Sequence, residues 1–206
     1  MPTEVLVIGA GGHSKVVTEA LQASQPMARL VVVDEDITKA GHTLLANIPI
    51  EYLGDWSDFA VLCHVAIGNN SVRQRCGLEA HKNGKKLFTV VHPSACLSPT
   101  ATVSGGCFIA AKAVVAAESK LGEGCIINHC AVVDHDCCIG PYSHIAPHAT
   151  LSGGVVVGQG CLIGAGAIIL PMVKIGDGTV IGAGAVITGD VLNNKTYIGV
   201  PGKQVK

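Results

Sequence analysis

Residues 121–138 read LGEGCI, INHCAV, VDHDCC: three blocks of six that each begin with a large aliphatic residue and place a small residue fifth. The aliphatic position recurs at every sixth residue from Leu97 to Ile187, and the fifth position of each block is small or β-branched. A six-residue unit cannot bury its own apolar face, but short strands that turn after each unit can stack into a prism. The sequence therefore predicts a prism lined by these two positions.

The composition fits such a packed repeat and excludes several classes of function. The chain has 206 residues and is 49% hydrophobic but only 3% aromatic, with 26 glycines, so small and β-branched residues must fill its core. Its 14 basic and 15 acidic residues leave a net charge of −1, without a basic run that would bind nucleic acid or an anionic membrane surface. No stretch approaches the roughly 18 uninterrupted apolar residues of a membrane span. We expect a cytoplasmic protein.

The nine cysteines form no paired C-x-x-C motif that would indicate a zinc site. Four of them fall on the small inward position of the hexads, where a thiol is a compact apolar filler: Cys107, Cys125, Cys137 and Cys161. We therefore interpret these four cysteines as structural, and none of the other five has a partner pattern that would make it a metal ligand.

The first 90 residues have a different pattern, in which short apolar runs alternate with helical spacing, as in a parallel α/β sheet. The first run ends in a glycine-rich turn that includes Gly11, Gly12 and His13, and the second ends in Asp34 and Glu35. Glycines at the start of a helix let the backbone approach a phosphate, and an acid after the second strand can bind a ribose or a base. Ser14 replaces the third glycine of the dinucleotide fingerprint, which weakens the prediction of NAD. Because the domain is only about half the size of a full dinucleotide-binding fold, a single nucleotide is the better prediction. A tight strand-to-helix turn without a ligand is the structural alternative.

Polar residues interrupt the hexads at a few places, chiefly Asp134-His135-Asp136 and His144. A histidine between carboxylates is suited to act as a general base, because a carboxylate fixes its tautomer and stabilises the imidazolium. Exposed turn residues of a prism are the structural alternative. A zinc site is a third possibility, but His129, His135 and His144 are spaced so that they fall on different faces of one coil.

The hexads resemble those of the left-handed parallel β-helix in hexapeptide-repeat acyltransferases, with three hexads per coil. Together with five further motifs, they identify the chain as similar to the bacterial nucleotide-sugar acyltransferases. That family includes UDP-bacillosamine and GDP-perosamine N-acetyltransferases and sialic acid O-acetyltransferases. The motifs are GAGGH at 9–13, AIGNN at 66–70, HPSA at 92–95, VDHDC at 133–137 and IGVPGK at 198–203. The resemblance implies a Rossmann-like α/β domain over residues 1–90 and a left-handed β-helix over residues 91–206.

The resemblance also implies roles for individual residues. His135 matches the catalytic base and Asp136 the acid that raises its basicity. The residues matched to the acetyl-CoA site are His144, Gly153, Ala165 and Ala183, and those matched to the nucleotide-sugar site are Gly11, Gly12, His13, Asp34, Glu35 and Gly68. No metal is implied. Two residues depart from the family pattern: Glu35, where bacillosamine enzymes can carry aspartate, and Gly202, where alanine is usual.

The activity that the resemblance implies is direct transfer of an acetyl group from acetyl-CoA to the 4-amino group of a nucleotide-linked 4-amino-4,6-dideoxy sugar, in a homotrimer. A UDP-linked bacillosamine precursor is the favoured acceptor and GDP-perosamine the next. Because His135 and His144 are one and a half prism faces apart, one catalytic centre is expected to draw them from two subunits. The alternatives are O-acetylation of sialic acid, a non-catalytic trimer that binds nucleotide sugar, and a zinc hydratase.

Overall fold

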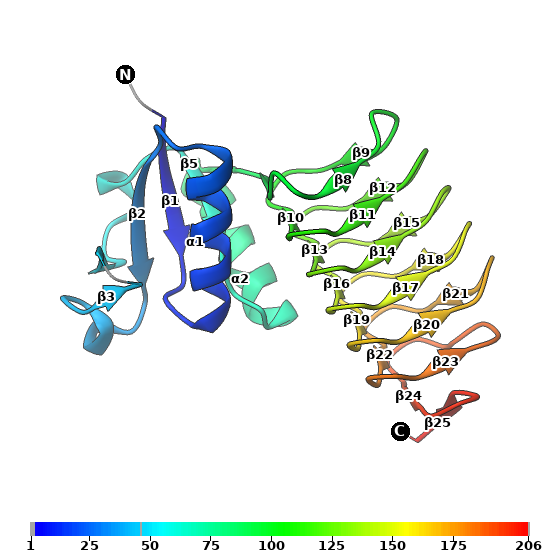
Figure 1. Cartoon of the computed structure of the whole chain (residues 1–206). Helices are drawn as coiled ribbons and strands as arrows, with labels where there is room; N and C mark the ends of the chain where they lie inside the picture. The colour runs from blue at the N-terminus through cyan, green and yellow to red at the C-terminus, as the bar shows by residue number, and fades with distance from the viewer. Residues whose placement is uncertain (1–2, 46, 206) are drawn as a thin grey trace.

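A computed structural model describes residues 3–45 and 47–205 and shows an α/β domain beside a long β-helix (Figure 1). The α/β sheet has the order β3-β4-β2-β1-β5-β6, and all its strands are parallel except β3. Its elements are β1 (Glu4–Ile8), α1 (Gly12–Ser24), β2 (Arg29–Asp34), β3 (Thr43–Leu44), β4 (Ile48–Tyr52), β5 (Leu62–Val65), α2 (Asn70–Lys82) and β6 (Lys86–Leu87). Short 3-10 helices span Ile37–Lys39 and Trp56–Asp58.

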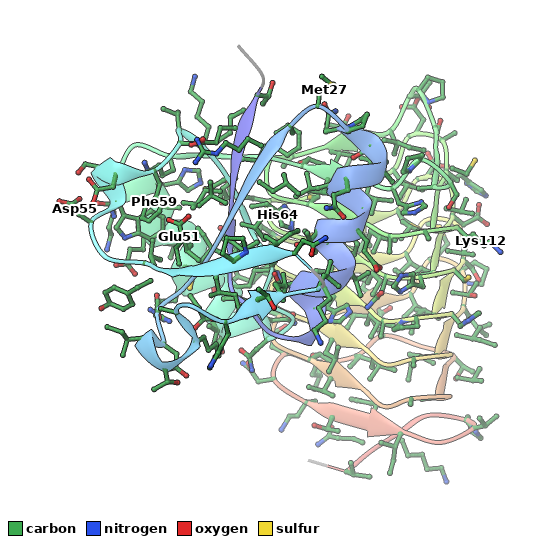
Figure 2. All side chains as sticks on the ribbon, turned by 60° about the vertical axis from the view of Figure 1, so that its left-hand side comes forward. Met27, Glu51, Asp55, Phe59, His64 and Lys112 are labelled. Carbon is green, nitrogen blue, oxygen red and sulfur yellow. The ribbon has the colours of Figure 1, made fainter. Side chains whose placement is uncertain are left out.

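The helices pack on opposite faces of the sheet because successive residues of β1 point to opposite sides. Val5 and Val7 pack with α1, whereas Leu6 and Ile8 pack with residues of α2. On β5, between β1 and the edge strand β6, His64 is buried and its Nδ1 lies 2.8 Å from the carbonyl oxygen of Phe88 (Figure 2). In the same view Lys112 projects from the side of the β-helix away from this domain.

The β-helix has three parallel faces, each named here after its first strand. The β7 face contains β7 (Val90–Val91), β10 (Phe108–Ile109), β13 (Ile126–Ile127), β16 (His144–Ile145), β19 (Leu162–Ile163), β22 (Val180–Ile181), β24 (Thr196–Ile198) and the antiparallel β25 (Lys203–Gln204). The β8 face contains β8 (Cys96–Leu97), β11 (Val114–Val115), β14 (Val132–Val133), β17 (Thr150–Leu151), β20 (Ile168–Ile169) and β23 (Val186–Ile187). The β9 face contains β9 (Thr102–Val103), β12 (Lys120–Leu121), β15 (Cys138–Ile139), β18 (Val156–Val157) and β21 (Lys174–Ile175). The predicted left-handed β-helix is confirmed.

The register follows the hexads, since each strand pairs with the strand three hexads further along. Val114 pairs with Val132, for example, and Val132 pairs with Thr150. The second residue of most strands and the small residue before the strand fill the interior of the prism. The buried position predicted for Cys107, Cys125, Cys137 and Cys161 is confirmed, because each is 0% exposed.

These thiols also donate hydrogen bonds, in addition to filling space. The Sγ atoms of Cys107 and Cys125 lie 3.1 and 3.2 Å from the carbonyl oxygens of Gly122 and Gly140, at the turn of the following coil. A buried carbonyl without a partner is costly, so the small inward residues help to satisfy the turns of the prism.

The two domains are joined along α1 and α2. The apolar side chains of Phe108 and Ile126, on the β7 face, are buried against α1. Arg73 of α2 donates from Nε to the carbonyl of Gly124 and from Nη2 to that of Tyr142, both at 2.7 Å. Asn70 of α2 donates to the carbonyl of Gly160. The three carbonyls that α2 binds lie at the same corner of three successive coils. Among the described residues, no helix is long and apolar enough to cross a membrane.

Candidate active site

His135 lies in the turn between β14 and β15, at the corner where the β8 face meets the β9 face. Its Nδ1 is 2.8 Å from Oδ2 of Asp136, and both side chains are well exposed, at 61% and 64%. The amide of His135 donates to Oδ1 of Asp134 at 2.8 Å, which fixes the backbone before the imidazole. Asp136 adopts a left-handed backbone conformation, with φ of +59°, which Asp tolerates better than most residues.

The electrostatics of this turn favour a basic imidazole. The hydrogen bond to Asp136 and the nearby charge of Asp134 raise the pKa of His135 above its ordinary value. With its Nδ1–H directed to the carboxylate, the neutral ring has its unprotonated nitrogen at Nε2, where it can accept a proton. Such an arrangement is suited to general-base chemistry, with the acid orienting the imidazole.

The His135 turn opens into a pocket of about 580 Å³. It is lined by Asp134, His135, Asp136, Ser152, Gly153, Gly154, Pro171 and Met172. A Cβ on Gly153 would lie 2.5 Å from Cε1 of His135, so the imidazole rests directly against the backbone of the next coil. The structure therefore brings the matched residues His135, Asp136 and Gly153 together.

His144, the first residue of β16, lies on the β7 face and points toward the α/β domain. Its Nε2 is 3.1 Å from Nδ2 of Asn128, and the backbone of Gly68 also hydrogen-bonds to the ring. Burial, with the nearby charge of Arg73, lowers the pKa of His144 to about 4. His144 is therefore neutral near pH 7 and can orient a polar group, but it is a far weaker base than His135.

His13 is part of the same interdomain region. Its ring makes an edge-to-face contact with Phe108 at 5.3 Å between centroids, and burial lowers its pKa to about 3. Nε2 of His13 is buried and has no hydrogen-bond partner among the described residues. A buried polar atom without a partner needs an explanation, such as a bound ligand, ion or water, and Ser14 and Thr18 of α1 each have a hydroxyl oxygen of the same kind.

A second pocket, of about 270 Å³, lies at the carboxyl ends of β1, β2 and β5, where the strand order reverses. This switch point is where open α/β sheets bind ligands. The lining residues are Ile8, Gly9, Ala10, Gly11, His13, Asp34, Glu35, Lys39, Ala66, Ile67, Val72, Arg75 and Cys76. Gly9 has φ of +103°, and a Cβ there would lie 2.7 Å from Ile67, so only glycine fits at the start of the turn.

The two acids of this pocket are already engaged within the protein. Oδ2 of Asp34 accepts from the amide of Ala10 at 2.8 Å and from Nζ of Lys39 at 2.9 Å. Although partial burial opposes it, the hydrogen bonds to the carboxylate lower the pKa of Asp34. Glu35 forms a two-point ion pair with Arg75, at 2.9 and 3.2 Å. The sequence analysis did not predict Lys39 or Arg75 as site residues. Neither residue belongs to a recognised motif, and the fold brings both to the pocket from other segments of the chain.

The other matched residues lie outside both pockets. Gly12 begins α1, and Gly68 follows β5, where its carbonyl accepts from Arg73 at 3.1 Å. Ala165 and Ala183 are exposed in turns at the corner of the β7 and β8 faces. In one protomer these two alanines are therefore at a different corner of the prism from His135.

Within the described part of the chain, no group of three or more His, Cys, Asp and Glu side chains is placed to hold a metal ion.

Comparison with protein families matches residues 4–77 to the PglD N-terminal domain, and residues 118–153 and 154–189 to the bacterial transferase hexapeptide repeat. A variant of perosamine N-acetyltransferase from Caulobacter crescentus, solved with CoA and GDP-perosamine, is 37% identical with a TM-score of 0.92, covering 98% of this chain and 97% of that one. The acetyltransferase domain of PglB from Neisseria gonorrhoeae, solved with acetyl coenzyme A, is 36% identical with a TM-score of 0.92, and the match covers 100% of both chains. UDP-N-acetylbacillosamine N-acetyltransferase of Bacillus subtilis is 34% identical over 110 residues, which is 52% of this chain and 51% of that relative. The matched segment thus spans about half of this curated protein.

Proposed function

Because the chain belongs to the family of hexapeptide-repeat sugar N-acetyltransferases with a PglD N-terminal domain, we propose that it acetylates the 4-amino group of a nucleotide-linked 4-amino-4,6-dideoxy sugar. Acetyl-CoA is the donor, and a UDP-linked bacillosamine precursor is the favoured acceptor, with GDP-perosamine next. The observation that carries the proposal is the His135–Asp136 pair, exposed in a pocket and joined at 2.8 Å.

In this proposal His135 removes a proton from the amine as the nitrogen attacks the thioester carbonyl. The imidazolium returns that proton to the CoA sulfur as the C–S bond breaks, and CoA leaves as the thiol. Asp136 holds the imidazole tautomer and stabilises the imidazolium. The transfer is direct, without an acyl-enzyme. Cys137, which directly follows Asp136 in the chain, is disfavoured as an acyl carrier, because it is 0% exposed and burial raises its pKa to about 11.

The glycine-rich turn is proposed to hold the nucleotide diphosphate at the start of α1. A Cβ on Gly11 or Gly12 would meet no atom within 4 Å, and neither residue has a positive φ. Neither packing nor backbone conformation therefore requires glycine at these two positions. Close approach of a phosphate to the backbone at a helix N-terminus does require it.

Gly11→Ala tests this phosphate site. We expect the KM for the nucleotide sugar to rise at least about tenfold, since the methyl group of alanine would occupy the position proposed for a phosphate group. The KM for acetyl-CoA should be unchanged, and the free energy of unfolding should change by no more than about 1 kcal/mol. Gly189→Ala is the matched control, because Gly189 also has open space around its Cβ position. An unchanged KM for the nucleotide sugar in Gly11→Ala would place the diphosphate elsewhere.

The complete site is proposed to form between protomers of a homotrimer. The α/β domain covers the first three strands of the β7 face. The β9 face exposes Lys120 and Lys174. The outward positions of the β8 face carry no charge: Cys96, Val114, Val132, Thr150, Ile168 and Val186. If this face surrounds the threefold axis, the His135 corner of one protomer lies beside the Ala165 and Ala183 corner of its neighbour.

The raised pKa of His135 predicts a pH dependence. A general base must be unprotonated, so the rate falls as the pH drops below the pKa of His135, and the acid limb of kcat/KM lies above the ordinary histidine value. Asp136→Asn removes the carboxylate charge, and Asn tolerates the left-handed conformation equally well. We expect the acid limb to move to lower pH and the plateau rate to fall about tenfold. An acid limb at the same pH in both proteins would show that Asp136 does not set the basicity.

A panel of acceptors tests the substrate. Thiol release from acetyl-CoA is measured with UDP-, GDP- and dTDP-linked 4-amino-4,6-dideoxy sugars and with free sialic acid. We expect rapid release with one amino sugar, with the UDP-linked compound favoured. Thiol release with sialic acid alone would favour O-acetylation. If none of the acceptors in the panel gives thiol release, a binding protein without catalytic activity is favoured.

A further inference from the structure

A buried serine closes the turn that carries His135, as Ser143 closes the 158–161 turn at another corner of the prism. Other turns at the corner of His135 lack such a serine. In three of those turns the last amide donates to the carbonyl three residues earlier: Ala101 to Ser98 at 3.1 Å, Ser119 to Ala116 at 3.4 Å, and Val173 to Leu170 at 3.4 Å. In the His135 turn, the amide of Cys137 donates instead to the hydroxyl of Ser119, at 3.2 Å. That hydroxyl donates in turn to the carbonyl of Asp134, at 2.6 Å. Ser119 is thus inserted between the two ends of the turn.

Ser119 reaches this position from inside the prism. It belongs to the preceding coil and is 0% exposed, so it contacts neither solvent nor any bound substrate. Two further hydrogen bonds fix the rest of the His135 turn. Oδ1 of Asp134 accepts from the amide of His135, while the amide of Asp136 donates to the carbonyl of Ala117, two residues before Ser119. A shift of the Asp134 backbone would therefore move the imidazole.

We propose that Ser119 is a positioning residue for acetyl transfer, whose hydroxyl holds the 134–137 turn open and so directs the imidazole of His135 into the pocket beside Gly153. This inference rests on the proposed function, in which His135 is the base. Without the hydroxyl, the Cys137 amide can donate directly to the Asp134 carbonyl, as the equivalent groups do in the 98–101, 116–119 and 170–173 turns. The 134–137 turn would then become tighter. Displacements of about 1 Å at a reacting group can cost about 10²-fold in rate.

Ser119→Ala is the primary test. The prism accepts this side chain, since Ala113, Ala131 and Ala149 occupy the equivalent inward position in other hexads and are buried. We expect kcat to fall roughly 10- to 100-fold, while the KM for each substrate changes less than about twofold. The acid limb of the pH profile should move to lower pH, because the carboxylates that raise the pKa of His135 are no longer held beside it.

Two companion variants separate positioning from stability. Thr179→Val removes another buried hydroxyl, which donates to the carbonyl of Leu192 at 2.8 Å in the last coil. It should lower the thermal midpoint and leave kcat and the pH profile unchanged. Ser119→Thr keeps the bridging hydroxyl, and Thr179 shows that threonine fits this hexad position, so its kcat should stay within about threefold of the wild type.

The outcomes distinguish this inference from the proposed function. If Ser119→Ala retains the kcat and pH profile of Thr179→Val, Ser119 is only structural and the inference is wrong. If His135→Ala itself retains turnover, the proposed base is wrong and Ser119 has no imidazole to position. Should Ser119→Ala fail to fold, Ser119→Val replaces it, since Val155 and Val173 occupy the same hexad position and are buried. The valine side chain has no hydrogen-bonding group, so kcat should fall to a similar extent, and no loss would overturn the inference.

Discussion

His135→Ala is expected to lower kcat by about 10²–10⁴-fold, which corresponds to roughly 3–5 kcal/mol in activation free energy. The variant removes the group that takes the proton from the attacking amine. It leaves the prism intact, because the imidazole is 61% exposed and lies outside the interior packing. Steady-state thiol release from acetyl-CoA with the acceptor measures the loss, and circular dichroism checks the fold.

His42→Ala is the control for this substitution. His42 is an exposed histidine of the α/β domain, and its main-chain hydrogen bonds do not depend on the side chain. It should keep wild-type turnover. Near-normal turnover in His135→Ala would remove His135 from the mechanism.

Arg73→Met is expected to lower the free energy of unfolding by about 3–5 kcal/mol, since each buried polar group left without a partner costs about 1–3 kcal/mol. Arg73 is 1% exposed, and its guanidinium bonds to backbone carbonyls and one amide oxygen, with no carboxylate partner in the described residues. Burial lowers its pKa to about 10, so it remains charged near pH 7. Methionine keeps the apolar stem but leaves the Gly124 and Tyr142 carbonyls without donors.

Arg75→Met is the matched control, two residues along the same helix. Arg75 is 54% exposed and pairs with Glu35 on the surface, where an ion pair contributes about 0–1 kcal/mol. Urea denaturation of both variants gives the comparison. Equal losses of stability would show that the Arg73 contacts do not hold the two domains together.

The hexad pattern predicted much of the β-helix because a repeat constrains every coil in the same way. A shift of the register by one residue would expose Ile127 and Val133 and bury their polar neighbours. Both side chains are fully buried, as the pattern requires. The spacing likewise placed Cys125 and Cys161 inside the prism, although it could not show that their thiols donate to carbonyls of the following coil.

The contacts that build the candidate site were harder to predict because they join distant segments. Arg73 sits in a polar helix, where a charged residue is typical of a solvated face, yet the structure buries it between α2 and two coils. Ser119 occupies a hexad position shared with alanine and cysteine, so its bridging role depends on how one turn opens. The pairing of His135 with Asp136 was readable because the residues are adjacent. The site residues carried over by resemblance remain proposals, and the structure places them at more than one corner of the prism.

The most direct measurement of the central claim is the stoichiometry of the reaction with the purified chain. Acetyl-CoA and the nucleotide-linked 4-amino sugar are incubated with the protein, and both products are quantified over time by thiol titration and mass spectrometry. The account predicts one CoA thiol released for each nucleotide sugar that gains a single acetyl group, carried as an amide at the 4-position. Thiol release without an acetylated sugar, or acetylation at a hydroxyl group only, would contradict it.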